Sequence, residues 1–244
     1  MDPEELEQHA KKMVETMVHY FRTLDSLKVL PQVKPGFLTD CVPKEAPVEG
    51  ESVDDMLADV ERLIIPGTTH WLSPSMHAYF PALTSVPSIL GDMLSLALNS
   101  LCFTWASCPS GTELEMVVMD WLAKMLDLPS QFLHTSEDSN GGGVILTTCS
   151  EGTLNSLLAA RRRAIDNYRF LQVEQSKELS DSEINGKLIA YCSDLAHSSL
   201  EKNSLIALVR IRFLETDPQT GGLRGNVLWK AIETDLNDGL VPFY

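Results

Sequence analysis

The stretch from Gly141 to Ala164 constrains the fold of this chain more than any other. Three glycines follow a polar loop, and the short apolar, β-branched run at residues 144–148 predicts a buried strand. From Ser150 onward the apolar residues repeat with helical period, and three arginines follow near the negative end of that helix. A buried strand that leads directly into an amphipathic helix is typical of an α/β sheet.

The junction between this strand and helix is a candidate anion site. Thr148, Cys149 and Ser150 are small residues that stand where a helix begins. The first N–H groups of a helix have no partner within it, and its dipole favours negative charge, so a phosphate could bind there. The alternative is that Ser150 only caps its own helix.

The rest of the C-terminal half extends the α/β pattern. Further strands are predicted at residues 187–192, 209–214 and 240–244, and a helix is predicted at 226–236. From Gly141 the order is βαβαβαβ, which indicates a mostly parallel sheet with helices on both faces. Because the sequence stops in a strand that would normally continue into another crossover, we expect the chain to be truncated mid-domain, as the first part of a larger protein.

The N-terminal part is predicted to be helical. One amphipathic helix starts at Asp2 and runs to about Ser26, and a second starts at Ser52, with a proline-rich connector between them. We therefore expect residues 1–85 to form an arm that clasps a second subunit, and residues 86–244 to be the incomplete first part of a large domain. Further helices are predicted at residues 87–99 and, with a capping box made by Thr112 and Glu115, at residues 112–127.

Composition excludes several classes of function. The net charge of −15 argues against nucleic acid and anionic membranes as partners. No apolar run approaches the ~20 residues of a membrane span, and the acidic N-terminus does not resemble a signal peptide. Five cysteines without a CxxC pair favour reduced thiols and the cytoplasm. No metal-binding, dinucleotide-binding, Walker or GxSxG motif is present.

Two features outside the glycine-rich stretch are candidate site residues. The aromatic segments at residues 70–83 and 103–106 follow neither helical nor strand periodicity, so they either line a pocket or fill space beneath a loop. His197 comes between a predicted strand and a helix, where open α/β sheets bind ligands; alternatively it is a hydrogen-bonded structural histidine.

Taken together, these motifs resemble the group II pyridoxal-phosphate-dependent amino-acid decarboxylases, and within them the animal histidine and aromatic-amino-acid decarboxylases. The resemblance covers the chain from its first helix to its last residue. It is carried by His70-Trp71, Ser73-Pro74, residues 77–81, 103–106, 112–115, 119–122 and 141–143, Ser150-Glu151 and residues 196–199.

The resemblance implies a type I pyridoxal-phosphate fold, like that of aspartate aminotransferase, and a homodimer with active sites at the interface. It implies that pyridoxal 5′-phosphate is held at its phosphate by Thr148, Cys149 and Ser150, and that His197, as the catalytic residue, stacks on its ring. It implies an amino-acid substrate that loses its carboxylate as carbon dioxide to give an amine. The residues implied for the substrate pocket are Trp71, Tyr79, Phe80, Pro81 and Ala82, with Leu101 and Phe103 of the partner subunit.

The sequence also departs from the family pattern. By the resemblance, the lysine that binds the cofactor covalently lies beyond Tyr244, so this chain alone is predicted to be inactive. Cys102 stands where the family usually has glycine, and Leu195 stands for glutamine. Two other hypotheses therefore stay open: an inactive short homologue that dimerises with or modulates a full-length relative, and an unrelated α/β protein that binds phosphate esters.

Overall fold

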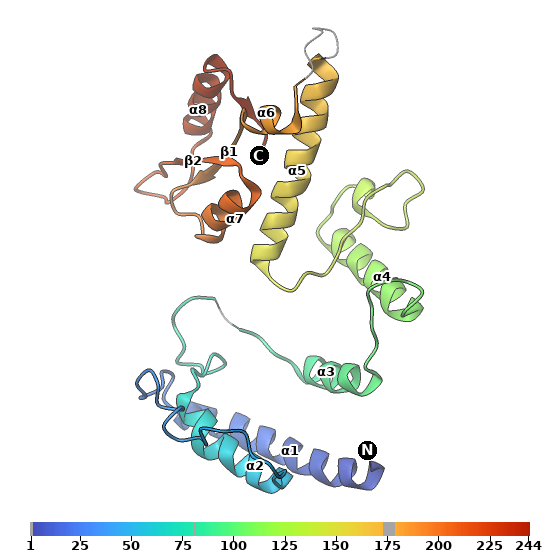
Figure 1. Cartoon of the computed structure of the whole chain (residues 1–244), viewed down its shortest axis with the longest axis vertical. Helices are drawn as coiled ribbons and strands as arrows, with labels where there is room; N and C mark the ends of the chain where they lie inside the picture. Colours follow the sequence, from blue (N-terminus) through green and yellow to red (C-terminus); the bar gives the residue numbers. More distant parts are fainter. Residues whose placement is uncertain (1, 81, 173–178) are drawn as a thin grey trace. The chain divides into compact units, whose positions relative to one another are not determined.

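The structure is a computed structural model that describes every residue except 1, 81 and 173–178 (Figure 1). It divides into two compact units, Met1–Leu101 and Cys102–Tyr244. The predicted arm, residues 1–85, lies within the first unit, which also contains the helix that follows it. The assignment of that helix to a large domain stays a prediction.

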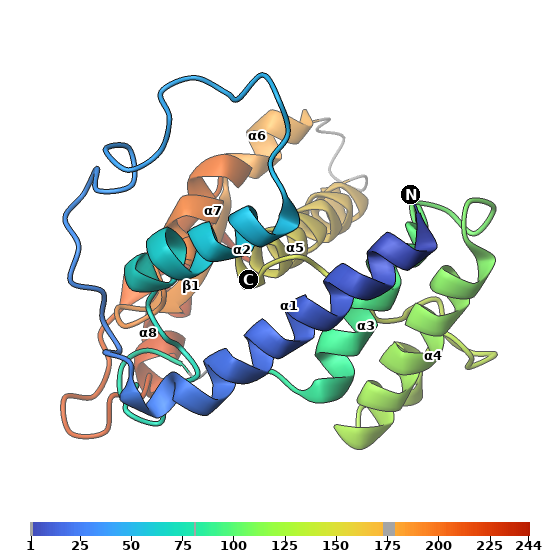
Figure 2. The same ribbon diagram turned by 90° about the horizontal axis from the view of Figure 1, so that it is seen from below.

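The first unit begins with the predicted helix, α1 (Pro3–Thr23), which continues as a 3₁₀ turn, η1 (Leu24–Ser26). Asp2 caps it by accepting a hydrogen bond from the Glu4 N–H at 3.0 Å. The second predicted helix is α2 (Val53–Asp59), capped by Ser52 and followed by a π turn, η2 (Val60–Ile64), and a 3₁₀ turn, η3 (Ile65–Gly67). Between the two helices the proline-rich connector contains neither helix nor strand and forms a long loop (Figure 2).

The last helix of the first unit is α3 (Val86–Leu98), close to its predicted bounds. Ser85 and Ser88 form a reciprocal capping box at its start, and Asn99 ends it in the left-handed conformation. None of its residues is buried, although it is rich in leucine. Its apolar side chains therefore have no core within the described parts of the chain.

The predicted start of the next helix is wrong. α4 (Pro109–Met125) begins three residues before Thr112, because Pro109 suits the first helical turn. Thr112 is already inside the helix and donates its N–H to the Cys108 carbonyl. The carboxylate of Glu115 is not part of a cap; it accepts the Ile145 N–H at 2.8 Å. A short 3₁₀ turn, η4 (Ser130–Phe132), follows.

The C-terminal part contains the predicted parallel sheet. Its strands are β1 (Leu188–Ser193), β2 (Arg210–Leu214) and β3 (Val241–Pro242), in the order β2-β1-β3. Both pairs are parallel, with Ile189 opposite Arg210 and Leu188 opposite Val241. Parallel neighbours need crossover connections, and helices supply them here.

Helices cover both faces of this sheet. The helices that follow the glycine-rich stretch and β1 pack on one face, where Leu157, Ala190 and Ala207 form a core. Tyr191, one residue after Ala190, points to the opposite face and donates its hydroxyl to Asp235 at 2.9 Å. The α/β prediction is therefore confirmed. The helices are α5 (Cys149–Gln172), α6 (Asp181–Asn185) and α7 (Ser199–Ala207), with α8 (Gly225–Asn237) on the second face.

The predicted strand at residues 144–148 is not formed. The segment has no regular secondary structure and lies outside the sheet, and Val144 and Ile145 are 60% and 63% exposed. No described strand lies beside it, so its backbone donors are taken by side chains instead: Glu115 accepts the Ile145 N–H, and Glu151 accepts the Thr147 N–H. A strand exists only by pairing, and local sequence does not supply the partner.

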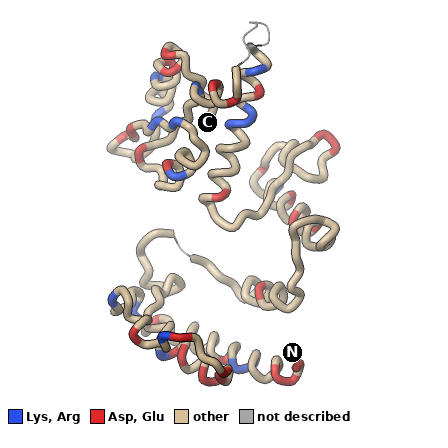
Figure 3. The backbone as a smooth tube through the Cα atoms, in the orientation of Figure 1, with Lys and Arg blue, Asp and Glu red and all other residues tan. Residues whose placement is uncertain are grey.

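Acidic residues are scattered over the helices and loops of both units (Figure 3). Most of the ion pairs are exposed, as between Lys11 and Glu7, and such pairs contribute little to stability. None of the helices formed by the described residues is long and apolar enough to cross a membrane.

Candidate functional site

The start of α5 is fixed by side chains on both sides of the junction. The Thr148 hydroxyl accepts the Glu151 N–H at 3.1 Å, so Thr148 is the cap and the alternative that Ser150 caps its own helix is wrong. The Glu151 carboxylate in turn accepts the hydroxyl and the N–H of Thr147, at 2.6 and 3.1 Å. These hydrogen bonds, the one from the hydroxyl first, lower the pKa of Glu151.

Two backbone donors remain open at this helix start. Among the described residues, none accepts a hydrogen bond from the N–H of Cys149 or Ser150. The Cys149 side chain is exposed and Ser150 is half-buried. A phosphate needs donors that converge on one point in a positive potential, and the first turn of a 24-residue helix offers both. The residues present therefore fit a phosphate group.

A buried side chain holds these donors in place. Asn203 of α7 is 3% exposed, and its amide donates to the carbonyl of Ser150 at 2.8 Å. The bond joins the start of α5 to the middle of α7, where Asn203 lies. This residue could not be predicted, because an asparagine in a short polar helix carries no pattern that points to a distant carbonyl.

His197 lies at the same edge of the sheet. β1 ends at Ser193 and α7 begins at Ser199. His197 therefore lies at the carboxyl end of the strands, next to the start of α7. Its Nδ1 accepts the Ser199 N–H at 3.1 Å and lies 3.0 Å from the Ser199 hydroxyl oxygen. The ring is thus oriented by the helix start, while its surface stays exposed.

The aromatic segment of the first unit forms a cavity of its own. Trp71, Tyr79 and Ala82 line a volume of about 450 Å³, and the rings of Trp71 and Tyr79 lie 5.6 Å apart. Buried His70 fixes the segment, because its Nδ1 lies 2.8 Å from the Tyr20 hydroxyl and its N–H donates to the Val29 carbonyl.

The other predicted pocket residues are not gathered there. Phe80 is 88% exposed, and Leu101 and Phe103 are 68% and 77% exposed. Pro81 lies outside the described residues. The structure thus brings together three of the predicted substrate residues in the first unit. In the second unit it places Thr148, Cys149 and Ser150 at the start of α5 and His197 just before α7.

Two of the three glycines, Gly142 and Gly143, are needed for close packing, which the sequence did not predict. A Cβ atom on Gly142 would lie 2.1 Å from the His134 ring, and one on Gly143 would lie 2.5 Å from Met119. The His134 ring nitrogen Nε2 is 2.7 Å from the Gly143 carbonyl, and the His134 N–H donates to buried Asp120 at 2.7 Å. Only glycine allows this close approach.

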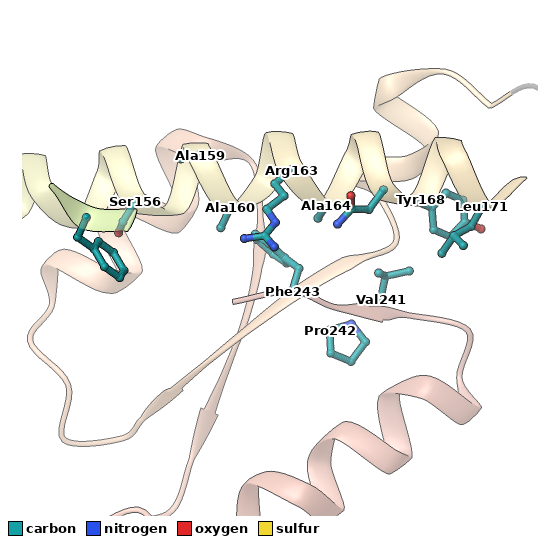
Figure 4. A pocket seen from close by; sticks show the side chains of 12 residues that line it. Ser156, Ala159, Ala160, Arg163, Ala164, Tyr168, Leu171, Val241, Pro242 and Phe243 are labelled. Carbon is teal, nitrogen blue, oxygen red and sulfur yellow. The ribbon is translucent and has the colours of Figure 1, made fainter. Parts of the chain in front are cut away.

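A second cavity lies between α5 and β3, with a volume of about 850 Å³. Figure 4 shows Ala160, Arg163 and Ala164 on the helix facing Val241 and Phe243 on the strand side. The lining is almost entirely apolar, apart from Arg163 and a few amide and hydroxyl groups. It contains none of the predicted site residues.

The fold and the candidate site indicate the class of protein. It is an α/β protein that presents helix N–H donors and a histidine at the carboxyl edge of a parallel sheet. Residues 35–244 match the model of the pyridoxal-dependent decarboxylase conserved domain. The chain therefore belongs to the pyridoxal-dependent decarboxylase family. This family assignment confirms the predicted cofactor, pyridoxal 5′-phosphate.

Individual relatives agree with this assignment. The chain is 52% identical to histidine decarboxylase of Drosophila melanogaster over all 244 residues, which are 28% of that protein. It is 45% identical to aromatic-L-amino-acid decarboxylase of Drosophila simulans, over 100% of this chain and 46% of the relative. The crystal structure of Oryza sativa TDC with PLP and tryptamine matches at a TM-score of 0.90 and 33% identity, over 100% of this chain and 51% of the other. The chain thus spans about half or less of the proteins that it matches.

Proposed function

We propose that this chain is the N-terminal portion of a pyridoxal-phosphate-dependent carboxy-lyase that converts histidine or an aromatic L-amino acid to the corresponding amine. One observation supports it above all: the Cys149 and Ser150 donors are open and are held by Asn203, in a chain of the decarboxylase family. The names of the relatives include both substrates, so the proposal covers both.

In this proposal Thr148, Cys149 and Ser150 bind the phosphate of pyridoxal 5′-phosphate through backbone N–H and hydroxyl groups. His197 covers the cofactor ring, in the orientation set by its hydrogen bond to the Ser199 N–H. When bound, the cofactor supplies the electron sink that receives the electrons of the broken bond to the carboxylate. The chain's own residues bind and orient it, and they exclude water from one ring face.

For the substrate we propose the aromatic segment. Trp71, Tyr79, Phe80, Pro81 and Ala82 would contact the side chain of the amino acid. The paired rings of Trp71 and Tyr79 favour a flat, aromatic or imidazole side chain over a charged aliphatic one.

We further propose that the protein is a cytoplasmic homodimer in which residues 1–85 are the arm and residues 86–244 begin the large domain. The exposed leucines of α3 and the exposed side chains of Leu101 and Phe103 support it, because apolar surface of this kind calls for cover. In the dimer, Leu101 and Phe103 of the partner subunit would complete the substrate pocket.

The phosphate site can be tested on the chain itself by calorimetric titration with pyridoxal phosphate. Ser150→Asp places a negative charge where the phosphate would bind, and we expect at least about a tenfold loss of affinity, or roughly 1.4 kcal/mol. The matched control is Asn155→Asp, an exposed residue on the same helix, which should bind normally. Equal binding of pyridoxal without its phosphate would contradict the proposal.

The activity is tested on the longer protein that contains this chain. We expect amine release from histidine or an aromatic amino acid, and loss of most of it in His197→Ala. A protein loaded with cofactor that releases no amine from any of these substrates would refute the reaction while leaving the phosphate site intact.

A further inference from the structure

Two thiols converge at the start of α4. A Cβ atom on Gly111 would lie 2.7 Å from Cys102 Sγ and 3.0 Å from Cys108 Sγ, so both sulfur atoms lie against the same point of the helix. The absence of a side chain on Gly111 leaves the space in which they meet. The two thiols share a hydrogen bond, which raises the pKa of Cys102.

The backbone between the two thiols is already folded back on itself. The Thr104 carbonyl accepts the N–H groups of Ser107 and Cys108 at 3.1 and 3.2 Å, and the Thr104 N–H donates to the Ser107 hydroxyl at 3.1 Å. Trp105 is tied to α4 by its indole N–H, which donates to Glu113 at 2.8 Å. The turn therefore holds the cysteines together without a covalent bond, and little chain entropy remains to be lost on joining them.

We propose that Cys102 and Cys108 form a reversible intramolecular disulfide, a redox modification site that closes residues 102–108 into a ring. The oxidant is a low-molecular-weight disulfide such as oxidised glutathione. The Cys108 thiolate attacks it to give a mixed disulfide and one glutathione thiolate. The exposed Cys102, as its thiolate, then displaces the second glutathione. Two protein thiols are oxidised, and one glutathione disulfide is reduced to two thiols.

The test is titration of the folded chain in glutathione redox buffers, followed by alkylation, trypsin digestion and mass spectrometry. The tryptic peptide 63–124 contains Cys102 and Cys108 and none of the other three cysteines. We expect it to lose two hydrogen atoms and to take up no alkyl group on oxidation, while the chain stays monomeric on a non-reducing gel. Reduction should restore both alkylation sites.

Cys41, which is exposed and distant in sequence, is the internal control, because it can only take up glutathione. Cys102→Ser and Cys108→Ser should each retain one glutathione on the remaining cysteine, whereas Cys41→Ser should leave the loss of two hydrogen atoms unchanged. Two outcomes would overturn the proposal. One is a peptide that carries two glutathione groups. The other is a peptide that stays fully alkylated at a buffer ratio where Cys41 is already modified.

Discussion

The second unit contains two regions with very different interiors. In residues 149–244, Leu157, Leu188 and Ala190 are at most 1% exposed and belong to continuous apolar cores. In residues 109–148, only Asp120 and Ala123 are buried. The first of these regions is organised by strand pairing and apolar burial, and the second by carboxylates and close glycine contacts.

The difference between the two regions shows that an apolar segment forms a strand only when a neighbouring strand pairs with it. β1 has a parallel neighbour on each side, so its backbone groups are paired and its side chains enter a core. Residues 144–148 are as apolar as a strand but have no described neighbour, so Glu115 and Glu151 take over the role of hydrogen-bond acceptors. The region around α4 is therefore the one whose order depends on a few polar contacts.

The largest expected effect concerns a completely buried carboxylate on the second face of the sheet. Asp235 is 0% exposed and accepts hydrogen bonds from Tyr191 and Arg212, both at 2.9 Å. Asp235→Ala removes the acceptor of both groups, and because Arg212 is 42% exposed and can be hydrated, we expect the free energy of unfolding to fall by about 2–4 kcal/mol. Urea denaturation measures it. Asp238→Ala, exposed at the end of the same helix, should change stability by less than about 0.5 kcal/mol.

The next effect probes the glycine contacts of the other region. In Gly142→Ala the new methyl group would overlap the His134 ring, so we expect a loss of about 1–3 kcal/mol in the free energy of unfolding. Gly225→Ala is the matched control, because nothing lies within 4 Å of its Cβ position. Similar stability of the two variants in thermal melts would show that the glycines are not needed for close packing.

The smallest expected effect is the pH dependence of the stabilisation that the Glu151 carboxylate provides. The pKa of Glu151 is lowered in the folded chain, chiefly by the Thr147 hydroxyl, so its ionised form stabilises the fold. The contribution is fully present above the ordinary pKa of a glutamate and is lost as pH falls through the lowered value. The stability advantage of the wild type over Glu151→Gln should therefore shrink on acidification. Glu137→Gln, exposed in a loop, should show no such trend.

Much of the candidate site could be predicted because its residues stand next to helix starts. The positions of Thr148, Cys149 and Ser150 at the start of α5, and of His197 after the end of β1, follow from local pattern, while their roles toward a cofactor came from the family resemblance. Asn203 could not be, since its partner is the carbonyl of Ser150, 53 residues away in the chain. The acceptor role of Glu115 was hidden for the same reason, 30 residues from Ile145.

The sequence alone determined the helix starts at Asp2 and Ser52, the two long strands β1 and β2, and the family. These depend on caps and periodic burial, which act within a few residues. Only the tertiary structure decided that residues 144–148 stay outside the sheet, that α4 begins at Pro109, and that Asn203 holds the start of α5. The physical reason is that strand pairing and buried hydrogen bonds join distant segments, so their partners exist only once the chain has folded.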